Sequence, residues 1–224
     1  MKNYPMAVLM LFSITAIYAQ GLTTKDFSSE TLRMSKTLGD ESYINGSPFI
    51  QEKFSPARVT GYDGQLYLAR FNAYNSQMIV DLGDKKIALD NSMFYEVTFT
   101  KTNKTYRTYS YNFENKKLKN GFLVVVKEND DFALLKEEKV TYIDVVPAAT
   151  TYQVDKPAKY DRDTDRYYVA FGDSVYFLPS KRKDLLKQFP TKSKELKTFL
   201  KDNKVSLKDE NDLAELAEFI SSMP

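Results

Sequence analysis

The sequence predicts a mainly β protein, an antiparallel β-sandwich or open barrel with a small C-terminal α-helical cap. Three observations lead to this prediction: short runs of aromatic and β-branched residues, turns of two or three residues between them, and helical spacing after Pro179. Antiparallel strands can be joined by such short turns, whereas parallel strands need long crossover segments. Helical patterns do not alternate with the strands before Pro179, so we expect no parallel α/β sheet.

The first 19 residues are typical of a signal peptide. Lys2 is followed by an apolar run from Met6 to Ile17, and the small residue Ala19 precedes Gln20. The run is too short for a comfortable membrane span of roughly 20 residues. We predict cleavage after Ala19, with an uncleaved anchor or a buried first helix as the alternatives. The mature chain contains no later stretch apolar enough to span a bilayer, so we expect an exported, soluble protein, periplasmic or extracellular.

The composition excludes several kinds of chemistry. The 224 residues include no Cys, His or Trp, and their net charge is +2. Without Cys the exported chain has no disulfides and is not a lipoprotein, so it depends on its core alone. Without His there is no Ser-His-Asp triad and no ordinary zinc site. The small net charge gives no global attraction to nucleic acid.

Three regions follow the signal peptide. Residues 20–47 are a polar leader with one expected short helix near residues 29–38, and turn-forming residues at 45–48 end it. Residues 48–179 form the predicted β-rich domain, and residues 180–224 form a helical C-terminal region.

The β-rich domain is predicted to be a succession of strands. Gly83-Asp84, residues 102–104 and Gly172-Asp173 are the expected hairpin turns. From residue 105 to residue 113, successive side chains should point alternately to one face and to the other, which is typical of a half-exposed strand. The expected strands are residues 65–75, 78–82, 85–90, 94–101, 105–113, 122–126, 132–146, 166–171 and 174–178.

Helices are predicted from the change in apolar spacing after Pro179. The expected helices are residues 181–189, which Pro190 ends, residues 193–203 and residues 209–222. In the last of these, Leu213 and Leu216 lie on one apolar stripe and should be buried. Ser206 with Asp209 is typical of a capping box at its start.

Several segments together resemble a known group of proteins. These are GSPFIQEKF, YLARFNAYNSQM, NGFLVVVKENDDFALLKEE and the lysine-rich C-terminal region. They resemble segments of uncharacterised exported proteins of Bacteroidetes (flavobacteria), over nearly the whole mature chain. The resemblance implies a class of organism and a compartment, and it implies no activity and no catalytic residues.

One group of acidic residues has a spacing suited to a metal ion. Asp161, Asp163 and Asp165 alternate in YDRDTDRYY, as do the first ligands of a calcium loop. Arg166 stands where a calcium loop has Gly, and no Glu occupies the twelfth position. The alternative is a solvated acidic hairpin tip whose carboxylates are neutralised by Arg162 and Arg166. The sequence therefore makes calcium the one cofactor to test.

Tyrosines are frequent on the expected strands. An exposed row of Tyr rings can stack on a sugar or a peptide, because each ring combines apolar area with a hydroxyl group. Packing on a half-buried sheet surface is the simpler explanation. Among the tyrosines on these strands are Tyr67, Tyr74, Tyr106, Tyr109, Tyr111, Tyr167, Tyr168 and Tyr176.

The helical region is divided by charge. Residues 181–204 contain nine basic and three acidic residues, a net charge of +6, whereas residues 205–224 contain one basic and five acidic residues, a net charge of −4. The basic part has the charge to meet an acidic surface or anionic lipid headgroups. Alternatively, the two parts attract each other and neutralise their charges within the protein.

Two classes of function fit these observations. The first is an exported binding or interaction module of the cell envelope, with a protein, a peptide or a glycan as its partner. The second is an extracytoplasmic hydrolase that uses carboxylates or Tyr, which requires a pocket with convergent acids and a shifted pKa. The lack of His, Cys and any recognisable catalytic motif favours the binding module.

Overall fold

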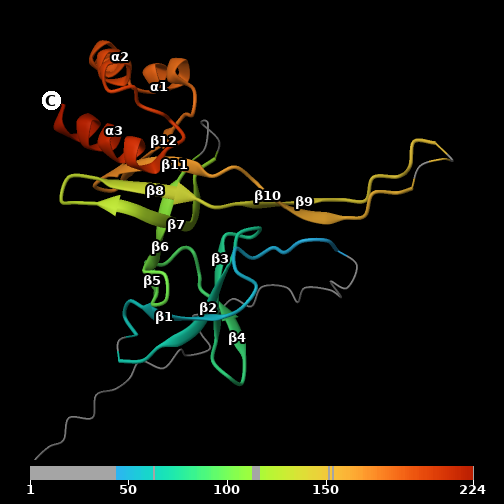
Figure 1. Ribbon diagram of the computed structural model, residues 1–224. Helices are drawn as coiled ribbons and strands as arrows, with labels where there is room; N and C mark the ends of the chain where they lie inside the picture. The colour runs from blue at the N-terminus through green and yellow to red at the C-terminus, as the bar shows by residue number, and fades with distance from the viewer. Residues whose placement is uncertain (1–43, 63, 113–116, 151, 153, 224) are drawn as a thin grey trace, which may run out of the picture.

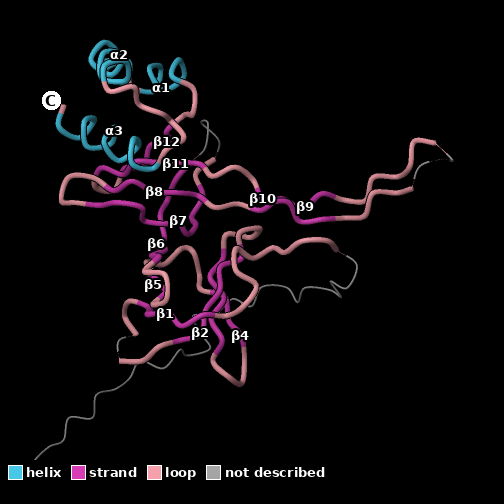
Figure 2. The backbone as a smooth tube through the Cα atoms, in the orientation of Figure 1, coloured by secondary structure: helices cyan, strands magenta, loops and turns pink. Residues whose placement is uncertain are grey.

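The computed structural model describes residues 44–62, 64–112, 117–150, 152 and 154–223. The predicted signal peptide, and the leader as far as residue 43, lie outside the described residues. In the described part strands dominate, and the helices follow them at the C-terminal end (Figures 1 and 2). The predicted fold class, mainly β and antiparallel with C-terminal helices, is confirmed.

The elements follow one another along the chain in the order of their numbers. The strands are β1 (Ser55–Val59), β2 (Tyr67–Asn72), β3 (Gln77–Asp81), β4 (Lys86–Ala88), β5 (Glu96–Phe99), β6 (Lys104–Tyr111), β7 (Lys119–Glu128), β8 (Ala133–Glu137), β9 (Val140–Ile143), β10 (Lys159–Arg162), β11 (Arg166–Phe171) and β12 (Ser174–Leu178). The helical segments are α1 (Arg182–Gln188), the short 3₁₀ turn η2 (Pro190–Lys192), α2 (Ser193–Asp202) and α3 (Glu210–Ser222).

Ten of the strands form one antiparallel sheet. Their order is β12-β11-β8-β7-β6-β5-β1-β2-β3-β4, and β9 pairs with β10 in a separate two-stranded ribbon. The large sheet is not closed. It curls, so that the edge strand β12 comes close to β6 although three strands separate them in the order. Of the two predicted architectures, the open barrel describes this half of the sheet better than the sandwich does.

The hairpins lie where the sequence predicts them. Gly83-Asp84 connects β3 to β4, and Gly172-Asp173 connects β11 to β12. Gly83 and Gly172 have φ angles of 90° and 54°, in the left-handed region that glycine enters without steric cost. The β5–β6 hairpin also forms, with Phe99 opposite Lys104.

Three strands depart from the expected pattern. β1 lies between β5 and β2 although it contains Pro56, which lacks a backbone N–H and argues against a central strand. The single strand expected over residues 132–146 breaks after Glu137 into β8 and β9. β10 covers Lys159–Arg162, so Asp161 lies on a strand and not at a hairpin tip.

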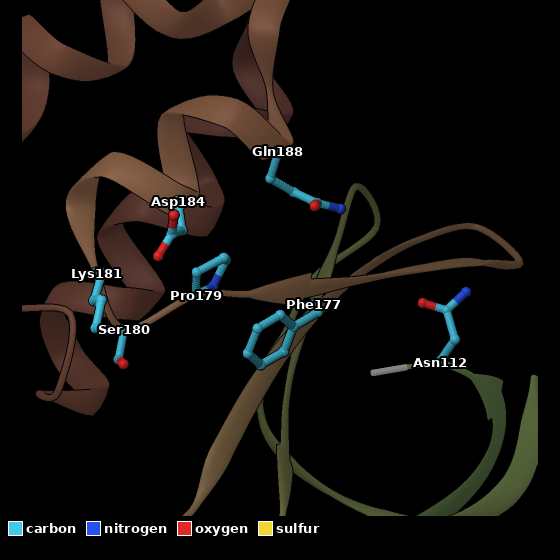
Figure 3. Close-up of a pocket in the computed structure, with 7 residues that line it drawn as sticks. All are labelled: Asn112, Phe177, Pro179, Ser180, Lys181, Asp184 and Gln188. Carbon is cyan, nitrogen blue, oxygen red and sulfur yellow. The ribbon is translucent and has the colours of Figure 1, made fainter. Parts of the chain in front are cut away.

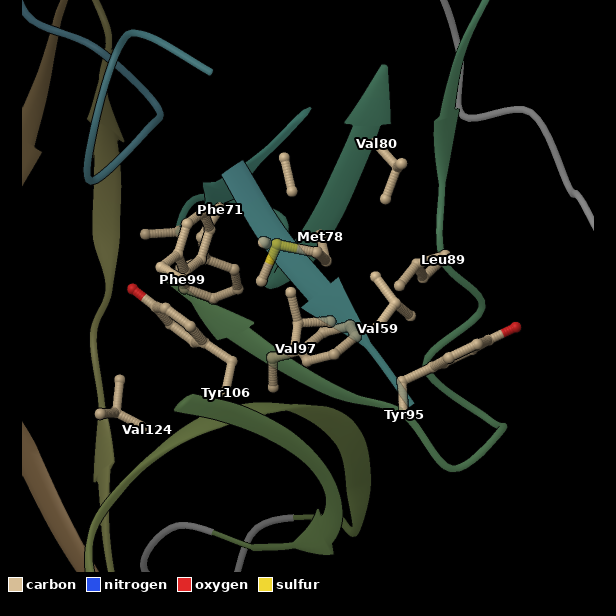
Figure 4. Close-up of a cluster of buried hydrophobic side chains, with 14 of the residues drawn as sticks. Val59, Phe71, Met78, Val80, Leu89, Tyr95, Val97, Phe99, Tyr106 and Val124 are labelled. Atoms are coloured by element: carbon tan, nitrogen blue, oxygen red, sulfur yellow. The ribbon is translucent and has the colours of Figure 1, made fainter. Parts of the chain in front are cut away.

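Strand alternation divides the buried side chains among three clusters. Figure 4 shows the first cluster, in which Tyr106 of β6 and Val124 of β7 pack against side chains of β1 to β5. Leu123, one residue from Val124, packs in a second cluster on the other face of the sheet. The third cluster joins the sheet to the helices through side chains such as Leu134 of β8. Strands β6, β7, β8 and β11 therefore carry buried side chains on both faces of the sheet.

The three helices complete the third cluster. Leu213 and Leu216 of α3 are 1% and 0% exposed, as their spacing predicts. The capping prediction needs a correction, because Asp209 and not Ser206 is the N-cap of α3. The Asp209 side chain accepts hydrogen bonds from the amides of Asn211 and Asp212. The N-cap residue has an extended backbone, and Asp is favoured at this position as much as Ser.

We expect replacement of Leu216 with Ala to lower the free energy of unfolding by about 2 to 5 kcal/mol, because the cavity left in a packed core cannot be refilled. Urea unfolding at neutral pH would measure the change. Glu215→Ala is the matched control, because Glu215 is the exposed neighbour on the same helix. Equal midpoints for L216A and the wild type would show that α3 does not contribute to the core.

Candidate functional site at the base of the arm

The β9–β10 ribbon leaves the body of the protein as an arm. We define the arm as β9, β10 and the described residues between them. Figure 1 shows it extending well beyond the large sheet. The β8–β11 pairing ends with Glu137 opposite Arg166, and the β9–β10 pairing begins with Val140 opposite Arg162. The arm thus continues β8 and β11. Residues 138 and 139 separate β8 from β9, and residues 163–165 separate β10 from β11.

Two consecutive glutamates occupy this junction. Glu137 is the last residue of β8, and Glu138 follows it; they are 4% and 7% exposed. Successive residues of a strand point to opposite faces of the sheet. Each carboxylate therefore needs its own set of partners, because a buried carboxylate without hydrogen bonds or counter-ions is strongly unfavourable.

Glu137 finds its partners on the face of the second cluster. Lys119 Nζ donates to its Oε1 at 2.6 Å, and the Tyr168 hydroxyl donates to its Oε2 at 2.8 Å. The Tyr111 hydroxyl also donates to Oε1, at 3.2 Å. The guanidinium of Arg166 lies 3.5 Å from Oε2. One carboxylate thereby connects β6, β7, β8 and β11.

Glu138 has a similar set of partners on the opposite face. Lys104 Nζ donates to both of its oxygens at 2.7 Å, and the Tyr106 hydroxyl donates to Oε2 at 2.5 Å. Arg162, the last residue of β10, donates to Oε1 at 3.3 Å. Arg162 also pairs with Asp165 at 2.5 Å. This cluster therefore ties the arm to β6 in the body.

The surroundings keep both glutamates ionised. Burial by itself raises the pKa of the Glu137 carboxyl, but the hydrogen bonds and positive charges of Lys119, Tyr168 and Arg166 outweigh it and hold the pKa below its usual value. The pKa of Glu138 is lowered in the same way, since Lys104, Tyr106 and Arg162 outweigh its burial.

The pKa values of the neighbouring tyrosine hydroxyls shift in the opposite direction. Burial and the adjacent glutamates raise the pKa of the Tyr106, Tyr111 and Tyr168 hydroxyls. At neutral pH the tyrosines therefore keep their protons as donors while the glutamates keep their charges. This arrangement favours a fixed joint over proton transfer.

A cleft of about 920 Å³ adjoins the junction. Asp165 stands in its wall, and burial raises the pKa of this carboxyl more than Arg162 lowers it. The cleft combines positive, negative and hydroxyl groups, so it is suited to a polar ligand. Its lining residues are Arg162, Asp163, Thr164, Asp165, Arg166, Tyr167, Phe177, Leu178, Ser180, Leu207 and Lys208.

The structure separates the three aspartates that the sequence groups together. Asp161 pairs with Lys159 at 2.9 Å, the Asp163 carboxylate accepts a hydrogen bond from Thr141 at 2.9 Å, and Asp165 pairs with Arg162. Asp163 and Asp165 line the cleft, whereas Asp161 does not. In the described part of the chain no group of three or more acidic side chains is arranged to hold a metal ion. Calcium binding by these residues stays a prediction that would require each carboxylate to leave its partner.

A second, smaller cavity lies on the other side of Phe177. Its volume is about 330 Å³, and Figure 3 shows its walls, formed by the end of β6, by β12 and by α1. Phe177 and Ser180 line both cavities. Asp184 and Lys181 are the charged groups of the smaller cavity. With one acidic group among its lining residues, this cavity offers no pair of convergent acids.

Comparison with known proteins finds no family model, curated protein or solved structure that matches this chain. The site is therefore interpreted from its own geometry.

The sequence drew attention to the YDRDTDRYY loop, but it gave no indication that Glu137 and Glu138 are buried next to this loop. Arg162 pairs with the neighbouring Asp165, as expected, and also reaches Glu138. Arg166 reaches Glu137. The available signal was the pair of acidic residues that follows the apolar run from Phe132 to Leu135 after one lysine, Lys136. Such a pair most often marks the exposed end of a strand, so the sequence did not distinguish a buried pair from a solvated one.

We expect Glu137→Gln to lower the free energy of unfolding by about 2 kcal/mol at pH 7. Gln keeps the volume, but its one carbonyl oxygen can accept from only one of Tyr111 and Tyr168, and Lys119 and Arg166 lose their anion. Because the folded-state pKa of Glu137 lies below the unfolded value near 4.3, its contribution is full above that value and is lost as the pH falls through the folded pKa. The difference between the wild type and E137Q should therefore shrink below about pH 4.

Urea unfolding at a series of pH values would measure this difference. Glu195→Gln on α2 is the control, because Glu195 is exposed and makes no ion pair among the described residues. A difference between the wild type and E137Q that stays constant from pH 7 to pH 3 would contradict the assignment of a stabilising charge to Glu137.

Proposed function

We propose that this protein is an exported β-rich binding module of the bacterial cell envelope, and that its arm contacts an envelope protein, a peptide or a glycan. The signal-peptide pattern of residues 1–19 supports export to the periplasm or the exterior. Among the described helices, none has the length and apolar character needed to cross a membrane.

The exposure of the far part of the arm carries this proposal. Tyr152 and Val154 are 98% and 88% exposed, and Val145 and Val146 are about half exposed. Apolar area in water is unfavourable, by roughly 25 cal/mol for each Å² that could be buried. Several exposed apolar side chains on one segment are typical of an interaction site. Burial of these side chains against a partner would supply the free energy for binding.

The base of the arm supports the same interpretation, because several contacts brace it. The rings of Tyr74, Tyr142 and Tyr160 lie within 5.4 to 6.5 Å of one another where the arm meets the body. Asn45 exchanges backbone hydrogen bonds with residues 158 and 160 beside β10. Arg162 completes the attachment through Glu138. A braced arm loses less conformational entropy on binding than a free hairpin would.

We expect a protein whose residues 145–157 are replaced by Asn-Gly to fold but to lose its partner. Residues 144 and 158 lie opposite each other in the β9–β10 register, so a two-residue turn can join them. Affinity capture from envelope fractions, compared by quantitative mass spectrometry, would measure the loss. Partners recovered equally with and without residues 145–157 would refute the role of the arm.

Point variants separate the side chains of the arm from its backbone. The double variant Y152S/V154S should reduce capture at least tenfold, with no change in melting temperature, because both side chains are exposed. Leu66→Ser is the matched control, since Leu66 is 55% exposed on a different loop. An equal loss of capture in L66S would indicate non-specific apolar adhesion.

One observation favours a second candidate, a carboxylate-based hydrolase. Asp163 and Asp165 share the wall of the 920 Å³ cleft, and the pKa of Asp165 is raised, as a general acid requires. Their present hydrogen bonds to Thr141 and Arg162 favour a structural role instead. Turnover of p-nitrophenyl glycosides or esters by the wild type, abolished in D165N and kept in the arm-replaced protein, would support the hydrolase and displace the binding module.

A further inference from the structure

The charge of the basic part of the helical region, residues 181–204, is not neutralised by the acidic part. Of the α3 acids, Glu210 pairs with Lys136 of β8 at 2.7 Å, and Glu218 pairs with Lys127 of β7 at 3.3 Å. Asp209 and Asp212 accept hydrogen bonds from backbone amides near the start of α3. These four acidic groups are thus directed to the sheet and to the start of α3.

Three of the nine basic residues of this region have partners within the helical region that the structure describes, and the lysines of α2 do not take part. Among the described residues, the ion pair within this region is Lys187 with Asp184, at 3.5 Å on α1. Arg182 donates to the Val205 carbonyl, and Lys192 donates to carbonyls at the end of α3. The remaining lysines of α2 and its C-terminal end form no ion pair in the described part of the chain.

These lysines share one face of α2. Lys194, Lys197 and Lys201 follow the i, i+3, i+7 spacing that places side chains on one side of a helix. Lys204 lies two residues after the helix, beyond the C-cap Asn203, and all four side chains are exposed. We call them the lysine face. The apolar side chains Leu196 and Leu200 lie on an adjacent side of α2 and are buried in the third cluster.

The position of α2 leaves the lysine face accessible. In Figure 1, α1 and α2 lie at the end of the molecule farthest from β1 to β4, with α3 between α2 and the sheet. The lysine face belongs to a helix that is anchored to the core by Leu196 and Leu200. It is therefore a fixed row of positive charges at one end of the protein.

We propose that the lysine face docks the protein on the anionic headgroups of a phospholipid bilayer. The positive row is complementary to the negative potential of such a surface, which falls off within about a Debye length, near 10 Å at 0.1 M salt. Lysine is a compact point charge suited to many diffuse phosphates, whereas specific bidentate recognition of one phosphate favours arginine. The one arginine of this region, Arg182, is occupied by the Val205 carbonyl.

The inference is independent of the arm, because the two surfaces lie on different elements. Docking through α2 would hold the protein at a membrane surface and leave the arm to contact a partner. The lysine face is thus a second contact surface with a different chemistry.

Vesicle sedimentation with the mature protein tests the proposal. We expect binding to vesicles of 30% phosphatidylglycerol in phosphatidylcholine at 50 mM salt, and no binding to phosphatidylcholine alone. Each lysine near an anionic surface raises the binding constant roughly fivefold. Replacement of Lys194, Lys197, Lys201 and Lys204 with Gln should therefore weaken binding by at least about a hundredfold.

A second quadruple variant controls for the net charge. Replacement of Lys53, Lys85, Lys101 and Lys156 with Gln removes the same charge from exposed positions outside the helices, and it should weaken binding less than tenfold. Equal losses in the two folded variants would overturn the proposal, because the effect would then be one of global charge. Failure of the wild type to bind the anionic vesicles while it binds an anionic polysaccharide such as heparin would also overturn it.

Discussion

The burial of two consecutive glutamates is the interaction on which the rest of the structure depends. Glu137 and Glu138 face opposite sides of the sheet, so each side must supply an ammonium group, a guanidinium group and at least one tyrosine hydroxyl. β6 contributes to both sides, because its alternate residues include Tyr106 on one face and Tyr111 on the other. The two carboxylates therefore tie β6, β7 and β11 to the end of β8 and to the base of the arm.

The same interaction gives the arginines of the acidic loop their role. Arg162 ends β10 and Arg166 begins β11, and they bind the two glutamates from the outside. The loop between them is thereby held against the cleft, and the direction of β10 is set. In this protein the electrostatics of a buried junction, and not a long hydrophobic contact, orients the most exposed part of the chain.

The distribution of charge along the helices follows from the sheet as well. Lys127 and Lys136 extend from β7 and β8 to Glu218 and Glu210 of α3, which draws the acidic helix onto the sheet. The basic residues of α1 and α2 are left on the outer side. The protein thus presents an apolar arm in one direction and a positive helix face in another.

Local pattern was sufficient for much of the fold. The turns at Gly83 and Gly172, the strand limits around them and the apolar stripe of Leu213 and Leu216 depend on residues close in sequence, so the sequence determined them. The partners of Glu137 come from strands as far apart as β6 and β11, and their proximity depends on strand order, which no local pattern encodes. Tertiary structure alone decided that this carboxylate is buried, that Asp161, Asp163 and Asp165 separate, and that the α3 acids bind the sheet. The physical reason is that the environment of a charge depends on long-range packing, whereas a turn or an amphipathic stripe depends on its neighbours in the chain.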